Sequence, residues 1–365
     1  HPRVRRQRQM CIRDRFMAKS DLYKISGHWD HYKDGMFVLG DEEKDKEVFA
    51  LRPMTCPFQY QAYLNRKRSY RDLPLRYNET STLFRNEASG EMHGLIRVRQ
   101  FTISEGHLMC TPEQLEDEFR KCLELAIFML KTLGLYEDVS YRFSQWDPND
   151  RAKYIGTEEQ WNEAQGLMER ILNHLEIPYE IGIGEAAFYG PKLDIQIKNV
   201  YGKEDTLITI QIDQMLAEQF GMVYTDKDGK QKTPCIIHRT SIGCYERTLA
   251  LLIEKYAGAF PLWLAPVQVK LLPIADRHLD YLYEVKKQLE DKGFRCEVDD
   301  RSEKIGYKIR EAQLEKVPYM VVVGDKDIEN NTISIRKRKE GDLGAMTVEQ
   351  FLEKIVPDRD NKVID

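Results

Sequence analysis

A change in the pattern of apolar residues near residue 264 constrains this fold most, because it divides the chain into two regions of different architecture. Beyond it, strands and helices alternate: strand 267–274, helix 279–292, strand 295–300, helix 303–316 and strand 319–323. This order is typical of an α/β domain. A strand over 332–338 and a helix from Thr347 complete the region. We therefore predict a separate α/β domain with a mixed sheet over 264–365.

The region from 17 to 263 has a different pattern. Capping boxes begin helices at Thr111, which is predicted to run to about Gly134, and at Thr157, which is predicted to run to about Asn173. β-branched and aromatic runs predict strands over 141–146, 192–199 and 206–212, and a hairpin turn over 226–229. These elements indicate an α+β domain, an antiparallel sheet flanked by long helices.

Composition limits the class of protein. Of 365 residues, 42% are hydrophobic and 32% charged, and the net charge is −5, which fits a globular protein with a sizeable core. No apolar run reaches the ~18 residues that a membrane span needs. The seven cysteines are scattered singly without a CxxC pair, so we expect reduced thiols and a cytoplasmic location.

The first fifteen residues differ from the rest of the chain. HPRVRRQRQMCIRDR holds six arginines and one aspartate and shows no helical or strand periodicity. We expect residues 1–16 to be a non-native or disordered segment. A basic RNA-binding arm and a targeting peptide are the alternatives, although the segment lacks an apolar stretch and serines.

Two short patterns carry the chemistry of the first domain. Arg85 and Glu87 (in FRNE, 84–87) precede Arg97 and Phe101, so two adjacent strands could present two phosphate-gripping arginines and an aromatic ring to one pocket. Ordinary charged surface strands are the alternative. Gly243-x-x-Glu246-Arg247 adds an arginine near a helix N-terminus, a place where anions bind well. The alternative interpretation is a solvated ion pair between Glu246 and Arg247.

Taken together, these patterns resemble motifs 2 and 3 of the class II aminoacyl-tRNA synthetases. The surrounding sequence is similar to the threonyl-tRNA synthetases from about Asp21 to beyond Leu343. The segments that carry this likeness are SGHWDHYKDGMF (26–37), RPMTCP (52–57), SYRDLPLRY (69–77), SGEMHGLIRVRQF (89–101), FYGPK (188–192), IIHR (236–239) and WLAPVQV (263–269). The resemblance implies a class II catalytic domain over 17–263 and an anticodon-binding domain over 264–365.

The resemblance also implies one zinc ion, held by Cys56, His107 and His238. Each of these residues alone reads as an ordinary buried side chain. One Cys and two His match a catalytic zinc site with an open position. In the family the zinc binds the amino group and hydroxyl of threonine, which excludes valine, a near isostere.

The remaining site residues follow from the same likeness. Arg85 would hold the ATP α-phosphate and the amino-acid carboxylate, and Arg97 and Arg247 the β- and γ-phosphates. Glu87 would contact the adenine amino group and Phe101 would stack on the base. Magnesium would bridge the phosphates. Glu105, Tyr189, Thr209 and Gln211 would line the threonine pocket, with Lys192 beside the adenylate.

Two departures from the family pattern lie at the site. Ile103-Ser104-Glu105-Gly106-His107 replaces an expected Gln-Asp-Asp-Ala-His, so Glu105 takes the position of an aspartate and Ile103 offers no polar contact. Gln214-Met215 replaces a usual Phe and Ser-Leu-Pro stretch. We interpret these changes as marks of a variant subfamily.

The second domain would read the anticodon of tRNA(Thr) through Lys304, Arg310, Asp327 and Arg336. Ser302 stands where an asparagine is usual, and solvated surface charge is the alternative interpretation. We expect a homodimer for the parent protein. The segment that would hold motif 1 and the N-terminal domains common in the family are not recognised in this sequence, so we expect a fragment.

The resemblance therefore predicts a threonine–tRNA ligase whose partners are ATP, L-threonine and tRNA(Thr). The alternatives are another class II synthetase of the prolyl type, and a synthetase-like regulator that binds RNA without charging it. A prolyl-type enzyme should lack the Cys/His/His set.

Overall fold

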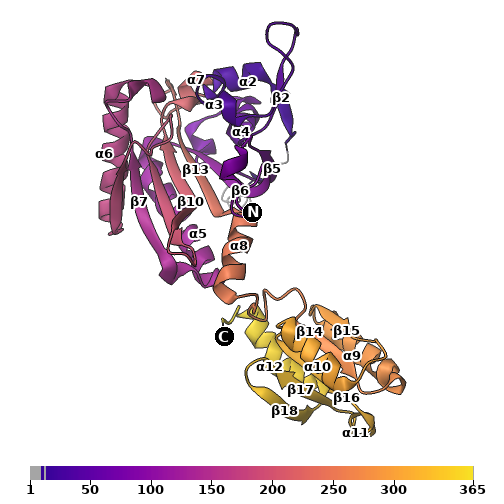
Figure 1. Ribbon diagram of the computed structural model, residues 1–365. Helices are drawn as coiled ribbons and strands as arrows, with labels where there is room; N and C mark the ends of the chain where they lie inside the picture. Colours follow the sequence, from indigo (N-terminus) through magenta and orange to yellow (C-terminus); the bar gives the residue numbers. More distant parts are fainter. Residues whose placement is uncertain (1–9, 12–13, 365) are drawn as a thin grey trace. The chain divides into compact units, whose positions relative to one another are not determined.

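The computed structural model describes residues 10–11 and 14–364, and these divide into two compact units, up to Leu251 and from Leu252 (Figure 1). The division falls inside helix α8 (Tyr245–Tyr256), ahead of the boundary expected at 263–264. No described helix is long and apolar enough to span a membrane.

An eight-stranded sheet is the centre of the first unit, in the order β1-β5-β6-β13-β10-β9-β7-β8. Its strands are β1 (Met10–Cys11), β5 (Leu75–Phe84), β6 (Gln100–Cys110), β7 (Val139–Gln145), β8 (Tyr179–Ile183), β9 (Lys192–Lys198), β10 (Glu204–Asp213) and β13 (Cys235–Cys244). The pairs β1·β5 and β7·β8 are parallel and the others antiparallel. The predicted antiparallel sheet is therefore confirmed except at its two edges.

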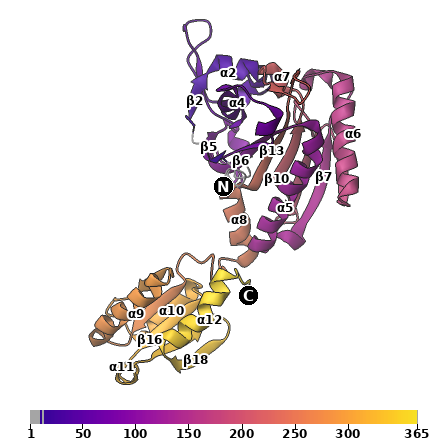
Figure 2. The ribbon, with the colours of Figure 1, turned by 180° about the vertical axis from the view of Figure 1, so that it is seen from behind.

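Two long helices lie alongside this sheet, α5 (Leu115–Leu133) and α6 (Glu158–His174) (Figures 1 and 2). The Thr157 capping box begins α6 as predicted, whereas the Thr111 box begins a 3₁₀ turn (112–114) that leads directly into α5. Helix α5 ends at Gly134 in the left-handed conformation. The apolar residues on the buried face of α5 are Leu115, Phe119, Cys122, Leu123, Ala126, Leu130 and Leu133. Glu118 of α5 is buried because its carboxylate accepts two hydrogen bonds from Arg76, each of 2.6 Å.

A smaller layer packs at one end of the sheet around buried aromatic residues. It contains a three-stranded sheet, short helices, a hairpin and several 3₁₀ turns. The elements are β2 (Met17–Lys19), β3 (Val38–Leu39), β4 (Phe49–Leu51), α2 (Ser20–Ile25), α3 (His28–Tyr32), α4 (Cys56–Leu64), α7 (Leu216–Gln219), β11 (Tyr224–Thr225) and β12 (Gln231–Lys232), with η1 (Lys33–Gly35), η2 (Tyr70–Asp72) and η3 (Ser89–Glu91). Outside this layer, η4 (Pro112–Gln114) and η5 (Tyr136–Asp138) contact α5, and η6 (Arg151–Lys153) precedes α6. The hairpin β11–β12 encloses the predicted turn.

The second unit is built on a five-stranded sheet of order β15-β14-β16-β17-β18, parallel in β15-β14-β16 and antiparallel beyond. Its elements are β14 (Val269–Pro273), η7 (Asp276–His278), α9 (Leu279–Asp291), β15 (Cys296–Val298), α10 (Ile305–Leu314), β16 (Tyr319–Val323), α11 (Asp325–Asn330), β17 (Ile333–Lys337), β18 (Gly341–Met346) and α12 (Val348–Asp360). Apolar residues of α9 and α12 pack on one face of the sheet, and those of α10 on the other. The predicted mixed α/β domain is confirmed, with α11 and β18 as additions.

Most of the segment expected to be non-native or disordered, residues 1–9 and 12–13, lies outside the described residues. The backbone of Met10–Cys11 pairs in parallel with Tyr77 and Asn78 of β5. The Asp14 N–H donates to Glu79 Oε1 at 3.0 Å. The expectation for residues 1–16 stays a prediction.

Candidate active site

One cavity of about 340 Å³ opens on the first unit between β6, β10, β13, helices α3 and α8, and the segment 85–98 that follows β5. Most site residues named from the sequence line it, namely Cys56, Arg85, Glu87, Arg97, Phe101, Glu105, Tyr189, Thr209, Gln211 and Arg247. Residues from both ends of the unit's sequence therefore meet in a single concave site.

The FRNE segment and Phe101 form one wall, because β5 and β6 pair in antiparallel register with Leu83 opposite Phe101. The Arg85 guanidinium carbon lies 5.1 Å from the centroid of the Phe101 ring, and Arg85 Nε donates to the Pro53 carbonyl at 3.4 Å. Glu87 Oε2 forms an ion pair with Arg97 Nε at 3.1 Å. Two predicted nucleotide contacts thus pair with each other in this structure.

Arg247 approaches the same cavity from α8. Its Nε donates to the Ile96 carbonyl at 3.0 Å and its Nη1 to the Thr206 carbonyl at 2.6 Å. Burial lowers the pKa of the Arg247 guanidinium from its usual value. Glu246 accepts the Thr102 N–H with both carboxylate oxygens, at 3.0 and 2.8 Å. The Glu246 carboxylate thus binds the backbone of β6 next to Phe101. It does not form the solvated pair with Arg247 that was the alternative interpretation of the sequence.

Gly243 fixes the approach of α8 to the sheet. Its φ is +72°, and a Cβ at this position would lie 2.0 Å from the Leu207 carbonyl oxygen of β10. A side chain would therefore force β10 and β13 apart, and Arg247 would move with them.

We expect Gly243→Ala to lower the free energy of unfolding by about 2–4 kcal/mol, since it adds both a left-handed backbone strain and a clash. Gly229→Ala is the matched control, because Gly229 has φ +79° and no atom within 4 Å of the added Cβ. Its cost should be about 1–2 kcal/mol. Urea unfolding of both variants measures the difference, and equal losses would contradict the role of the Leu207 contact.

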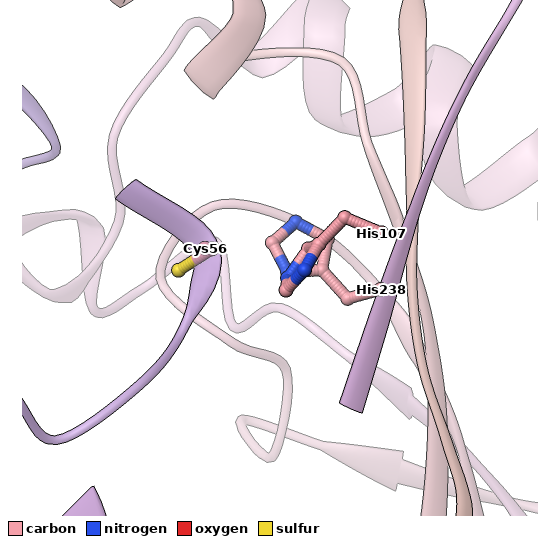
Figure 3. A group of neighbouring side chains, drawn as sticks. All are labelled: Cys56, His107 and His238. Atoms are coloured by element: carbon pink, nitrogen blue, oxygen red, sulfur yellow. The ribbon is translucent and has the colours of Figure 1, made fainter. Parts of the chain in front are cut away.

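Cys56, which lines this cavity, comes together with His107 and His238, and all three residues are buried (Figure 3). Cys56 is the first residue of α4, and the two histidines stand directly opposite each other on β6 and β13. One side-chain ligand atom from each lies within 4.8 Å of the other two. His107 Nε2 and His238 Nδ1 are 3.1 Å apart.

The outward nitrogens of both imidazoles have acceptor partners. His238 Nε2 lies 2.9 Å from Asp213 Oδ2 and 3.1 Å from the Tyr60 hydroxyl, and His107 Nδ1 lies 2.8 Å from Gln59 Oε1. Because the carboxylate and the amide oxygen accept, these nitrogens carry the protons. The inward nitrogens then present two lone pairs to each other, an arrangement that a metal cation would stabilise.

The protonation preferences of the cluster fit the same donor set. Burial and the neighbouring His238 hold the pKa of His107 well below its usual value, which favours the neutral ligand form. Burial, Glu105 and Asp213 raise the pKa of the Cys56 thiol well above its ordinary value. A nearby cation is therefore what would favour the thiolate at this place.

The predicted threonine-pocket residues form hydrogen-bonded pairs next to the cluster. The Tyr189 hydroxyl donates to Gln211 Oε1 at 2.5 Å, and the Tyr189 ring stacks on His238 with centroids 4.8 Å apart. Burial raises the pKa of Tyr189 well above 10. Glu105 Oε2 accepts from the Thr55 hydroxyl at 2.5 Å and from the Thr55 N–H at 3.3 Å. Glu105 is thus fixed by the residue next to Cys56.

Lys192 and Thr209 are joined by a residue that the sequence did not single out, Asp194. Its Oδ1 accepts from the Thr209 hydroxyl at 2.7 Å, and its Oδ2 from the Ser144 hydroxyl at 2.7 Å and from Lys192 Nζ. Asp194 is 1% exposed. Cross-strand register places these groups together, which local spacing could not indicate.

Further residues of the cavity had no predicted role, among them His28, Ile96, Phe188 and Thr240. His28 lies in the SGHWDHYKDGMF segment, which was noted for its resemblance alone. Its Nδ1 lies 2.7 Å from the Ser26 hydroxyl, and its ring meets the Phe188 ring edge-on at 4.9 Å. Burial lowers the pKa of His28 to about 3, so the ring is neutral.

The two segments that depart from the family pattern, at Ile103 and at Gln214-Met215, both lie near the cavity or the metal cluster. Ile103 lines the cavity two residues before Glu105 on the same face of β6. Gln214-Met215 lies in the turn before α7, where Asp213 Oδ1 accepts the N–H groups of Met215 and Leu216 at 2.8 and 2.9 Å. Asp213 therefore holds this turn and His238 at once.

The anticodon candidates lie on three elements of the second unit. Lys304 precedes α10 and Arg310 lies on it, both exposed. Arg336 of β17 lines a cavity of about 320 Å³ with Lys337–Lys339, and its Nη1 pairs with Asp342 at 3.3 Å. Asp327 is buried in α11, where it accepts from Gly324 N–H at 3.0 Å and the Ser334 hydroxyl at 2.9 Å. Its carboxylate thus stabilises the fold of this unit.

Comparison with known proteins places both units. The family model for the tRNA synthetase class II core domain (G, H, P, S and T) matches residues 37–256, and that for an anticodon binding domain matches 268–357. The threonine–tRNA ligase of Clostridium perfringens (strain 13 / Type A) is 66% identical over 340 residues, which are 93% of this chain and 53% of the relative. The threonine–tRNA ligase of Geobacillus kaustophilus (strain HTA426) is 45% identical over 343 residues, which are 94% of this chain and 52% of the relative. The chain spans about half the length of these relatives.

Solved structures show the same architecture. The RNA binding domain of threonyl-tRNA synthetase from Cryptosporidium parvum Iowa II superposes with a TM-score of 0.88 at 33% identity, covering 97% of this chain and 86% of that one. A putative threonyl-tRNA synthetase from Aeropyrum pernix gives a TM-score of 0.80 at 27% identity, covering 99% and 84%.

Proposed function

Because the chain belongs to the threonyl-tRNA synthetase family of class II aminoacyl-tRNA synthetases, we propose that it activates threonine with ATP and transfers the threonyl group to tRNA(Thr). The observation that carries this proposal is the meeting of two groups on one cavity. Cys56, whose Sγ lies within 4.8 Å of a ring nitrogen of His107 and of His238, lines this cavity together with Arg85, Arg97 and Arg247. An amino acid and a triphosphate could therefore be held side by side.

The metal of the cluster would be zinc, since one thiolate and two imidazoles are ligands that Zn²⁺ prefers and three protein ligands leave a position open. When bound, zinc would supply a Lewis acid for the amino group and hydroxyl of threonine. Gln59 and Asp213 orient the two imidazoles toward that position. Glu105, fixed by Thr55, would accept a hydrogen bond from the threonine amine or hydroxyl.

Arg85, Arg97 and Arg247 would bind the triphosphate of ATP. Phe101 would stack on its adenine. Glu87 would accept from the adenine amino group, once its pairing with Arg97 is exchanged for contacts with the nucleotide. Magnesium is expected with ATP, where it would offset the negative charge of the phosphates. Tyr189, Thr209 and Gln211 would line the amino-acid side, with Lys192 held near them by Asp194.

The proposed chemistry has two steps. A carboxylate oxygen of threonine attacks the α-phosphorus of ATP; the new C–O–P bond forms as the bond to the β-phosphate bridging oxygen breaks, and pyrophosphate leaves. A ribose hydroxyl at the tRNA 3′ end then attacks the carbonyl carbon, and AMP leaves. Arg85 stabilises the charge that develops on the α-phosphate in the first step. That carboxylate is already ionised, so adenylation needs no general base.

The second unit would bind the anticodon of tRNA(Thr) through Lys304, Arg310 and Arg336, with Asp327 shaping the surface between them. The match of residues 268–357 to an anticodon binding domain supports this assignment. A homodimer and a cytoplasmic location of the parent protein belong to the same proposal and rest on the family resemblance.

Threonine-dependent ATP–pyrophosphate exchange tests the proposal. We expect exchange with threonine, a rate ~10–200-fold lower with serine, and ~10⁴–10⁵-fold lower with valine, since valine lacks the hydroxyl that the site must bind. Exchange with proline instead would favour the prolyl-type alternative. A folded, zinc-loaded chain that exchanges with none of these amino acids would favour the non-charging RNA-binding alternative.

A further inference from the structure

Thr240 carries a hydroxyl that no described residue satisfies. It stands on β13 in the wall of the cavity, is 9% exposed, and its Oγ1 is buried without a hydrogen-bond partner among the residues that the structure describes. An unpartnered buried hydroxyl costs about 1–3 kcal/mol. In a native structure such a group calls for an explanation, and a ligand is one.

The position of Thr240 indicates which ligand atoms it would meet. It lies directly opposite Glu105 across the β6–β13 pair, and two residues from His238 on the same face of its strand. Beyond it the chain turns through Gly243 into α8 and Arg247. Along β13 and into α8, Thr240 therefore stands between His238 of the Cys/His/His cluster and Arg247.

The side chains of β6 that face Thr240 offer no hydrogen-bond donor to a ligand. Glu105 is an acceptor held by Thr55, and Ile103, the other cavity-facing residue on this stretch of β6, has no polar atom. An amino acid that places its amine at the cluster and its carboxylate toward Arg85 brings a carboxylate oxygen to this place. Arg85 would meet one side of that carboxylate, and the Thr240 hydroxyl would give the oxygen nearest β13 a further donor.

We propose that Thr240 is a substrate-binding residue whose hydroxyl donates a hydrogen bond to the carboxylate of the bound amino acid and, after activation, to the carbonyl oxygen of the adenylate. A turn of about 120° about χ1 carries Oγ1 from its buried position to the next staggered rotamer, and the proposed contact requires the rotamer that directs the hydroxyl into the cavity which Thr240 lines. The inference rests on the proposed activation of threonine and deepens it.

Three variants in the full chain test this. Thr240→Val keeps the shape and removes the hydroxyl, and Thr240→Ser keeps the hydroxyl. Ser81→Ala is the matched control, because the Ser81 hydroxyl is also buried without a described partner but does not line the cavity. The KM for threonine and the KM for ATP are measured separately by pyrophosphate exchange, together with the thermal unfolding midpoint.

We expect Thr240→Val to raise the KM for threonine roughly 10- to 100-fold, the loss of one hydrogen bond to a charged group, with the KM for ATP within about twofold. Its unfolding midpoint should stay the same or rise, since an unsatisfied hydroxyl is removed. Thr240→Ser should remain within about threefold of the parent chain, and Ser81→Ala should match it.

An unchanged KM for threonine in Thr240→Val, in a parent chain that exchanges with threonine, would overturn this inference and leave the proposed function intact. An equal loss in Thr240→Ser, or an equal rise in the KM for ATP, would assign Thr240 to packing and overturn it as well. A parent chain without threonine-dependent exchange would overturn both proposals.

Discussion

Replacing Cys56 by alanine should remove the metal and, with it, threonine activation. The variant leaves only the His107 and His238 nitrogens as ligands, too few for a stable site. We expect zinc content to fall from about one ion per chain to near zero. Threonine-dependent exchange should fall at least about a thousandfold, because the metal contributes several kcal/mol. Elemental analysis and pyrophosphate exchange on the same sample measure both losses.

Cys122→Ala is the matched control for this variant. Cys122 is equally buried but lies on α5, outside the cluster. It should lose a little stability through packing while it keeps its zinc and its exchange activity. Full threonine activation by metal-free Cys56→Ala would refute the assignment of the cluster to amino-acid binding.

Arg247→Met should give the second large loss. Methionine fills much the same volume but removes the positive charge, which we place against the phosphates of ATP. We expect kcat for exchange to fall by roughly 10²–10³-fold, as when a preorganised group that stabilises a transition state is removed. Arg247→Lys should recover part of this loss, since lysine keeps the charge without the planar donor pair.

Arg295→Met separates this effect from a loss of stability. Arg295 also donates to main-chain carbonyls, those of Ala265, Pro266 and Trp263, but it lies in the second unit. Its removal should lower stability and leave exchange, which needs no tRNA, unchanged. Equal exchange losses in the two variants would show that Arg247 acts through folding alone.

Local sequence signals predicted most elements of the second unit and the long helices and three sheet strands of the first, because these signals act over a few residues. The Thr157 capping box begins α6, the Thr111 box begins the 3₁₀ turn that leads into α5, and the left-handed Gly134 ends α5. Alternation of apolar residues identified β7, β9 and β10. Strand β18 was not predicted because its sequence, GDLGAM, contains two glycines and shows little alternation of apolar and polar residues.

The site was predictable only in part, since its contacts join distant segments. His107 and His238 are brought together by the register of β6 and β13, which periodicity does not determine, and the family resemblance alone named them. Asp194 and Thr240 belong to no recognised motif. Their importance arises from burial and from hydrogen bonds made, or left unmade, after folding.

The central claim is that a metal held by Cys56, His107 and His238 lets this cavity activate threonine. Its most direct test is threonine-dependent ATP–pyrophosphate exchange in one preparation before chelation, after removal of the metal, and after zinc is restored. We predict exchange that is lost with the metal and regained with zinc, while valine supports none at any stage. Undiminished threonine-dependent exchange in the metal-free protein would contradict it.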